Sequence, residues 1–292
     1  MKNNINRNKI IKDKKVKTVL FSVLFIVFAI GLIISLLQIF FWSNDNNDIL
    51  KLSEDISKNT EVKMIDNDKN TEVIEDESLK SDKDNSYWQF IKMPLIDVDI
   101  DKLIKQNKDT VGWINVNNTN INYPFMQTKD NKYYLTHAFD KSWNDAGWIF
   151  LDYRNNKDFS SKNNIIYGHS RLDKTMFGSL HNVLSSNWYN NKNNHIIRLS
   201  TQTENTMWQI FSVYKVPVET YYLTVDFPSS SDYSDFLKTI KDRSIHSFKV
   251  NVSSSDKILT LSTCSNNNKR VVVHAKLIKR SYKWFLVILW II

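Results

Sequence analysis

The sequence has only one cysteine among its 292 residues, Cys264. A single cysteine excludes an intramolecular disulfide and any metal site built from several cysteines. Histidine, aspartate and cysteine do not recur with metal-ligand spacing either, so we expect no metal and no other cofactor. The chain has no internal repeat. Glycine (5) and proline (4) are scarce, which we attribute to compositional bias and not to function.

A basic stripe interleaved with aromatic residues, the usual mark of a nucleic-acid-binding protein, is also missing. The net charge is +8, but much of the excess lies at the N-terminus, at Lys2, Arg7, Lys9, Lys12, Lys14, Lys15 and Lys17. The following polar segment is acidic overall. We therefore expect no nucleic-acid partner.

Residues 18–42 form a long apolar run without a charged side chain. About twenty apolar residues suffice to cross a bilayer as a helix. A cleaved signal peptide would have a shorter apolar region and a small-residue cleavage site, which does not follow Trp42. The lysines before the run predict a cytoplasmic tail at 1–17. We thus expect a single-pass signal anchor in the lipid of the cell membrane, with all later residues on the extracellular face.

The chain after the anchor divides by composition. Residues 43–87 are rich in charged and polar side chains and predict a stalk, with room for a short helix near Ile49 and Ile56. Residues 88–283 predict the folded domain. The last segment, 284–292, is apolar but about half as long as the roughly 20 residues of a membrane-spanning helix, and the sequence assigns it no role.

Strand patterns recur through the domain. They cover 111–116, 121–126, 148–152, 164–168, 196–199, 207–218, 248–252, 258–263 and 270–277. Helical patterns are fewer, at 98–104, 174–184 and 231–242. Many short strands with few helices predict a mostly β fold, a mixed β-barrel and not a βαβ sheet.

The segment that ends in Cys264 alternates apolar and hydroxyl side chains, which predicts a strand that delivers the thiol at its end. Arg270 opens the next strand, so a thiol and a guanidinium share one edge of the sheet. Thiol acyl transfer needs both a thiolate and a donor for the developing oxyanion. The alternative is that Cys264 is a small buried core residue. Lys269 is the rival cation, but alternation places it on the opposite face, and lysine lacks the bidentate fork.

One histidine stands at a comparable position. His169 ends the strand pattern 164–168, and Gly168 before it permits close approach of another segment. A base at a strand end matches the nucleophile at Cys264. The other histidines lack this context: His137, His181, His195, His246 and His274. We expect His274, inside the last strand, to be structural.

Three stretches together resemble the sortases, the membrane-anchored cysteine transpeptidases of Gram-positive bacteria. They are Asn164–Ser170, Thr260–Cys264 and Arg270–Val273. The resemblance extends over 88–278, and three further stretches look like class B: 111–124, 130–135 and 147–154. It implies a closed mixed barrel of about eight strands, with an N-terminal helix and a helix before the cysteine strand.

The resemblance also implies roles for the site residues. Cys264 would be the nucleophile, His169 the general acid and base, and Arg270 the cation that binds the substrate backbone or oxyanion. The loop after Cys264 is short and rich in asparagine, with Ser265 where class B members often carry an acidic residue. This departure leaves the sorting motif open between Asn-Pro-x-Thr-Asn-like and Leu-Pro-x-Thr-Gly-like signals.

The implied reaction is transpeptidation. The enzyme would cleave surface proteins after the threonine of a C-terminal sorting signal and pass the thioacyl group to an amine of a peptidoglycan precursor. Three alternatives stay open: a pilus-polymerising sortase with a pilin amine as acceptor, a plain cysteine protease that uses water, and a non-catalytic anchored module with an inert Cys264.

Overall fold

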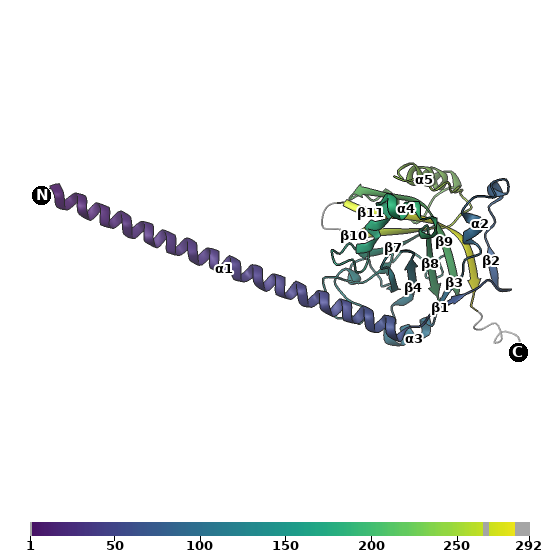
Figure 1. Cartoon of the computed structure of the whole chain (residues 1–292), viewed down its shortest axis with the longest axis horizontal. Helices are drawn as coiled ribbons and strands as arrows, with labels where there is room; N and C mark the ends of the chain where they lie inside the picture. The colour runs from purple at the N-terminus through teal and green to yellow at the C-terminus, as the bar shows by residue number, and fades with distance from the viewer. Residues whose placement is uncertain (1, 265–268, 284–292) are drawn as a thin grey trace. The chain divides into compact units, whose positions relative to one another are not determined.

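The computed structural model of the chain describes residues 2–264 and 269–283, and side chains within 16–263 and 269–283 (Figure 1). Three predicted features lie outside this description. They are the apolar tail at 284–292, Ser265 in the short loop, and the side chains of the basic cluster before residue 16. The backbone of Cys264 is described, but its side chain is not.

The chain forms two compact units, residues 1–48 and 49–292. The first consists of most of helix α1 (Lys2–Asn59), whose large apolar side chains between Val16 and Trp42 are exposed. Among the described residues, one helical stretch is long and apolar enough to cross a membrane, Val16–Asn59. This stretch contains the predicted span at 18–42, and it is consistent with a membrane anchor or a signal sequence.

Eight strands of the second unit form a closed barrel in the order β10-β7-β6-β5-β4-β8-β9-β11. Pairing of β10 with β11 closes the barrel. Two neighbouring pairs, β5–β6 and β7–β10, are parallel. The strands are β4 (Thr110–Val116), β5 (Asn122–Met126), β6 (Phe150–Leu151), β7 (Asn163–His169), β8 (Ile196–Thr201), β9 (Glu204–Pro217), β10 (Ile258–Cys264) and β11 (Lys269–Tyr282). The predicted closed mixed barrel is confirmed.

Few helices accompany the barrel, as predicted. The α-helices are α2 (Tyr87–Phe90), α3 (Ile100–Gln106), α4 (Ser186–Asn190) and α5 (Ser230–Asp242). Single or double 3-10 turns are η1 (Glu77–Leu79), η2 (Tyr133–Leu135), η3 (Gly178–Leu184), η4 (Lys192–Asn194) and η5 (Tyr221–Leu223). Helix α5 precedes the cysteine strand and buries Tyr233, Leu237 and Ile240 in a cluster with side chains of β9 and β11.

The segment assigned from sequence to a polar stalk contributes regular structure to the second unit. The end of α1 buries Ile49 and Ile56 in the main core. Strand β1 (Val62–Ile65) pairs with β3 (Leu95–Val98), and β2 (Thr71–Val73) extends the barrel sheet along β11. Lys279 of β11 is buried and donates to Asn67 Oδ1 (2.7 Å) and Ile91 O (3.1 Å). Strands β1 and β2 are defined by pairing with strands far along the chain, and such short strands show little periodic signal in the sequence.

Three element predictions were wrong in detail. The strand expected at 248–252 is absent, because Lys249 has a positive φ of 53° and interrupts the extended backbone there. The helix expected at 174–184 is the 3-10 segment η3, which begins only at Gly178. Lys174 (φ 67°) and Met176 (φ 49°) occupy the left-handed region, which excludes an α-helix before it. Strand β6 is also shorter than predicted.

His274 lies in a buried chain of hydrogen bonds inside β11. Thr260 Oγ1 donates to Asn163 Oδ1 (2.6 Å), so it must accept from His274 Nδ1–H (2.8 Å). The other ring nitrogen then accepts from the Tyr214 hydroxyl (2.8 Å). Burial lowers the pKa of His274 to about 3. The imidazole is therefore neutral in the folded state, in agreement with the expected structural role.

Replacing His274 with valine should flatten the dependence of stability on pH. The folded pKa lies below the unfolded value of about 6.5, so the unfolded state binds the extra proton. Stability is then fully present above pH 6.5 and is lost at about 1.4 kcal/mol per pH unit below it. Urea unfolding of the full chain in detergent, from pH 7.5 to 4.5, measures both slopes. Equal slopes in the wild type and His274→Val would contradict this account.

Candidate active site

The candidate site begins with the register of two parallel strands. Strands β7 and β10 pair from Ile258 with Asn163 through to Cys264 with His169. The last residue of each strand is thus the other's direct partner. Parallel neighbours need a crossover connection, here residues 170–257, and their carboxyl ends meet at one edge of the sheet. The backbone therefore brings the predicted nucleophile and the predicted base together at this edge.

His169 is half-buried and oriented by a backbone carbonyl. Its Nε2 lies 2.8 Å from the carbonyl oxygen of Leu135 in η2. A carbonyl only accepts hydrogen bonds, so Nε2 carries a proton. Proton exchange at this histidine therefore takes place at Nδ1. A histidine held in this way always offers the same ring nitrogen, Nδ1, for proton transfer.

Gly168 provides the close approach that the sequence suggested. A Cβ at this position would come 2.8 Å from Cγ of Phe177, whose side chain is fully buried. The amide of Phe177 also donates to the carbonyl oxygen of His169 (3.0 Å). The missing side chain at Gly168 thus allows the segment after His169 to fold back onto the end of β7.

Arg270 reaches back from β11 toward the end of β10. Its NH1 donates to the carbonyl oxygen of Thr263 (3.2 Å), the residue before Cys264. The Thr263 hydroxyl accepts from the Val271 amide (2.9 Å), which pins the two strands together. Within the described residues, the buried Nε of Arg270 has no hydrogen-bond partner. Lys269 is exposed. Arg270 thus lies beside the end of β10, bound to the residue that precedes Cys264.

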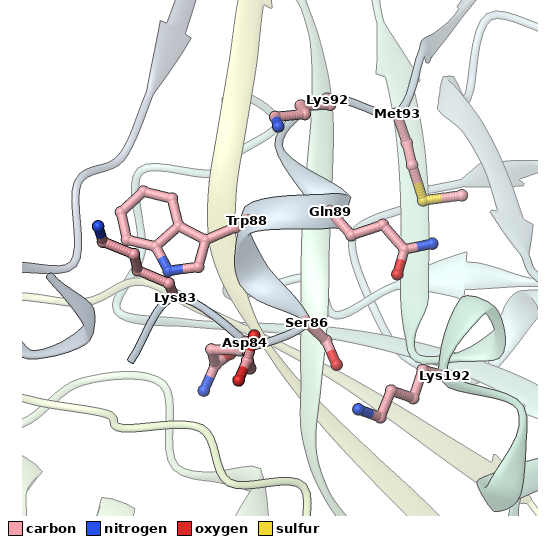
Figure 2. A pocket seen from close by; sticks show the side chains of 9 residues that line it. Lys83, Asp84, Ser86, Trp88, Gln89, Lys92, Met93 and Lys192 are labelled. Carbon is pink, nitrogen blue, oxygen red and sulfur yellow. The ribbon is translucent and has the colours of Figure 1, made fainter. Parts of the chain in front are cut away.

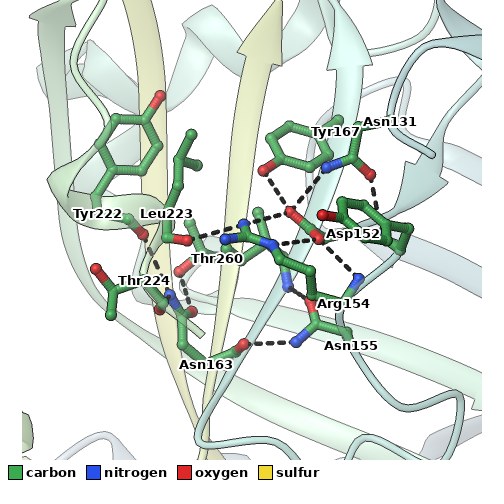
Figure 3. A network of polar contacts seen from close by, with 12 residues as sticks. Asn131, Asp152, Arg154, Asn155, Asn163, Tyr167, Tyr222, Leu223, Thr224 and Thr260 are labelled. Carbon is green, nitrogen blue, oxygen red and sulfur yellow. Dashed lines mark hydrogen bonds and ion pairs between the residues drawn. The ribbon is translucent and has the colours of Figure 1, made fainter. Parts of the chain in front are cut away.

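A buried network of hydrogen bonds centred on Asp152 lies beside β7 (Figure 3), and the sequence alone did not reveal it. Arg154 binds its carboxylate through Nε (2.9 Å) and NH2 (2.7 Å). The Tyr167 hydroxyl (2.8 Å) and Asn131 Nδ2 (3.0 Å) donate to the same carboxylate. Tyr167 lies two residues before His169. The network thus supports the strand that carries the candidate base.

Asp152 is ionised despite its complete burial. Desolvation alone would raise its pKa, but hydrogen bonds from Arg154 and Tyr167 outweigh it and hold the pKa below its usual range. The pairing with Asp152 in turn raises the pKa of Arg154. Asp152 and Arg154 lie in a turn, in which the Asn155 amide donates to the Asp152 carbonyl oxygen (3.0 Å). A turn of this kind leaves no periodic signal for the pair in the sequence.

One surface pocket of about 510 Å³ is lined by Lys83, Asp84, Asn85, Ser86, Trp88, Gln89, Lys92, Met93 and Lys192 (Figure 2). It includes none of the candidate catalytic residues. Within the described part of the chain, no group of three or more histidine, cysteine or acidic residues could hold a metal ion. The candidate site is therefore identified by the residues that meet at the edge shared by β7, β10 and β11, namely His169, Cys264 and Arg270.

Comparison with known proteins agrees with this geometry. The Sortase domain family model matches residues 114–278. This chain belongs to the sortase family. Sortase B of Listeria monocytogenes is 38% identical over 182 residues, which cover 61% of this chain and 73% of the relative. Sortase B of Staphylococcus aureus is 40% identical over 185 residues, covering 62% and 75%.

Solved structures place this sortase in class B. A Staphylococcus aureus sortase B–substrate complex superposes with a TM-score of 0.59 at 39% identity, covering 62% of this chain and 84% of that one. Sortase B from Bacillus anthracis in complex with AAEK1 gives 0.62 at 32% identity, covering 82% and 99%. The protein is accordingly a sortase-type cysteine transpeptidase with an apolar N-terminal helix.

Replacing Gly168 with alanine should destabilise this sortase and impair the site. The new methyl group would overlap the buried Phe177 ring, which costs about 1–3 kcal/mol when a packed core must yield. Gly31→Ala is the matched control, because nothing lies within 4 Å of a Cβ there. Thermal unfolding and peptide cleavage by the full chain in detergent measure both effects. Equal behaviour of the two variants would show that Gly168 has no packing role.

Proposed function

We propose that this sortase cleaves a C-terminal sorting signal after threonine and transfers the acyl group to a peptidoglycan amine. Cys264 is the nucleophile, His169 the general acid and base, and Arg270 the cation for the substrate backbone or oxyanion. The observation that carries the proposal is the direct register of Cys264 with His169, with Arg270 on the adjoining strand. The sortase B of Staphylococcus aureus has been solved as a substrate complex, which supports the proposal that this chain also binds a substrate.

The two half-reactions each use the same proton carrier. The Cys264 thiolate attacks the threonine carbonyl carbon, and the departing amine takes a proton from His169 as the peptide C–N bond breaks. The acceptor amine then attacks the thioester carbon, gives its proton back to His169, and releases the thiolate. The Leu135 carbonyl holds Nε2, so Nδ1 performs both transfers.

Arg270 acts on the negative charge that forms in each step. An ordinary cysteine titrates near 8.5, so only a few per cent would be thiolate at neutral pH. A guanidinium held beside the end of β10 raises that fraction. The guanidinium has further N–H groups besides the one bound to Thr263 O, and these provide donors for the oxyanion.

The membrane arrangement follows from the sequence and remains part of the proposal. Residues 18–42 anchor the chain in the cell membrane lipid, with 1–17 in the cytoplasm and the domain at 88–283 outside. In this arrangement both partners, sorted surface proteins and the peptidoglycan precursor, meet the enzyme on the extracellular face.

The deciding experiment uses quenched Asn-Pro-x-Thr-Asn and Leu-Pro-x-Thr-Gly peptides with the full chain in detergent. Each peptide is incubated with and without triglycine, and Cys264→Ala serves as the control. We expect cleavage that requires Cys264 and a product capped by the amine. Cleavage that yields only the free acid would favour a cysteine protease. Absence of cleavage, with Cys264 inert to iodoacetamide, would favour a non-catalytic module.

Arg270→Lys should separate the guanidinium's role from that of positive charge. Lysine keeps the charge but loses the fork that can hold Thr263 O and the oxyanion together. We expect kcat/KM for the cleaved peptide to fall about 10²-fold, the usual effect of losing one oxyanion donor. Lys269→Ala, at the exposed neighbouring cation, should change it less than twofold, a bound that we set for an exposed side chain. Similar losses in both variants would indicate a general electrostatic effect.

A further inference from the structure

Three consecutive backbone carbonyls beside the site are held by side chains from elsewhere in the chain (Figure 3). Asn163 Nδ2 donates to the carbonyl oxygens of Tyr222 (3.2 Å) and Thr224 (2.8 Å). Arg154 NH2 donates to the carbonyl oxygen of Leu223, between them (2.9 Å). We call the residues 221–224 the tethered turn. It comprises η5 and the residue that follows it.

These donors fix the backbone of the tethered turn, whose side chains are held separately by the burial of Tyr222 and by the Tyr221–Tyr214 hydroxyl bond (2.9 Å). Carbonyls at the end of a single helical turn have no partners within the turn. The turn opens the long connection 218–257 between β9 and β10, and long connections have conformational freedom unless they are fixed. Both donors are themselves fixed. Asp152 holds Arg154 bidentately, and Thr260 Oγ1 donates to Asn163 Oδ1 (2.6 Å).

The tethered turn also lies next to the catalytic edge. The hydroxyl of the fully buried Tyr222 is 3.1 Å from Ser262 Oγ on β10. Ser262 is the register partner of Tyr167, and the next pair on the same face is Cys264 with His169. Only one residue pair, Thr263 with Gly168, lies between the Ser262 that Tyr222 contacts and the Cys264–His169 pair.

Asp152 connects the turn to the opposite side of the site. Its carboxylate binds Arg154, which holds Leu223, and also Asn131 Nδ2. The loop that starts at Asn131 continues to Leu135, whose carbonyl orients His169. A single ionised carboxylate thus joins the segments on both sides of the Cys264–His169 pair.

We propose that Arg154, together with Asp152 and Asn163, is a positioning residue that fixes the tethered turn as one wall of the acyl-donor groove. This inference rests on the proposed transpeptidase function. Arg154 contacts no reacting group. It acts through the turn and determines how tightly the sorting peptide is bound, while the rate of the chemical step depends on Cys264, His169 and Arg270.

Arg154→Lys in the full chain in detergent tests this role. Lysine keeps a positive charge against the buried Asp152 but cannot bind it bidentately and reach Leu223 as well. We expect KM for the cleaved sorting peptide to rise about tenfold, as for the loss of one charge-assisted hydrogen bond. The turnover number and the rate of Cys264 alkylation by iodoacetamide should stay within about twofold, because Tyr167 and Asn131 still bind Asp152 and keep the His169 side of the site in place.

Arg280→Lys is the matched control. Arg280 also pairs with carboxylates, Glu72 (3.4 Å) and Glu204 (3.8 Å), but on the part of β11 that pairs with β2. It should lower thermal stability without changing KM. Asn163→Ser removes the other two hydrogen bonds to the turn and should raise KM in the same direction as Arg154→Lys.

Amide hydrogen exchange of residues 221–224 gives a second readout. Exchange should be faster in Arg154→Lys and unchanged in Arg280→Lys. A raised KM without faster exchange, or an unchanged KM in Arg154→Lys, would overturn the positioning role alone. If the wild type cleaves none of the peptides, the proposed function fails and this role fails with it.

Discussion

The parallel pairing of β7 with β10 is the constraint on which the site depends. Hydrogen bonds along this ladder fix which residue of one strand faces which residue of the other. A slip of one residue would turn every side chain of β10 to the other face of the sheet. Strand β10 also pairs with β11 and so closes the barrel. The same backbone contacts therefore close the core and bring Cys264, His169 and Arg270 to one edge.

Buried polar groups then refine what the barrel provides. Asp152 and Asn163 are completely buried, and each is satisfied by several hydrogen bonds. A carboxylate in such a place is tolerated only because Arg154 compensates its charge. The geometry of such networks is specific, whereas apolar packing tolerates alternatives. Apolar packing thus stabilises the barrel, and the buried polar groups hold the loops near the ends of β7 and β10 in defined positions.

The sequence predicts most of the barrel because its strands alternate strongly and its core residues are apolar. It also predicts that His169 and Cys264 lie close together, because each ends a strand pattern. Other features depend on contacts far apart in the chain. Strand β2 is short and polar, and only its pairing with β11 defines it. The positive φ of Lys249 and the Asp152–Arg154 centre likewise carry no periodic signal.

The pairing of β2 with the end of β11 has a mechanical consequence. The catalytic strands follow α1, β1 and β2 in the chain. A pull transmitted along the polypeptide from its N-terminal helix must first detach Ile49 and Ile56, then peel β1 from β3 and β2 from β11. Only then would the load reach β4, the next barrel strand in the chain. The contacts of these N-terminal elements thus break before the load reaches β7 and β10, the strands that end in His169 and Cys264.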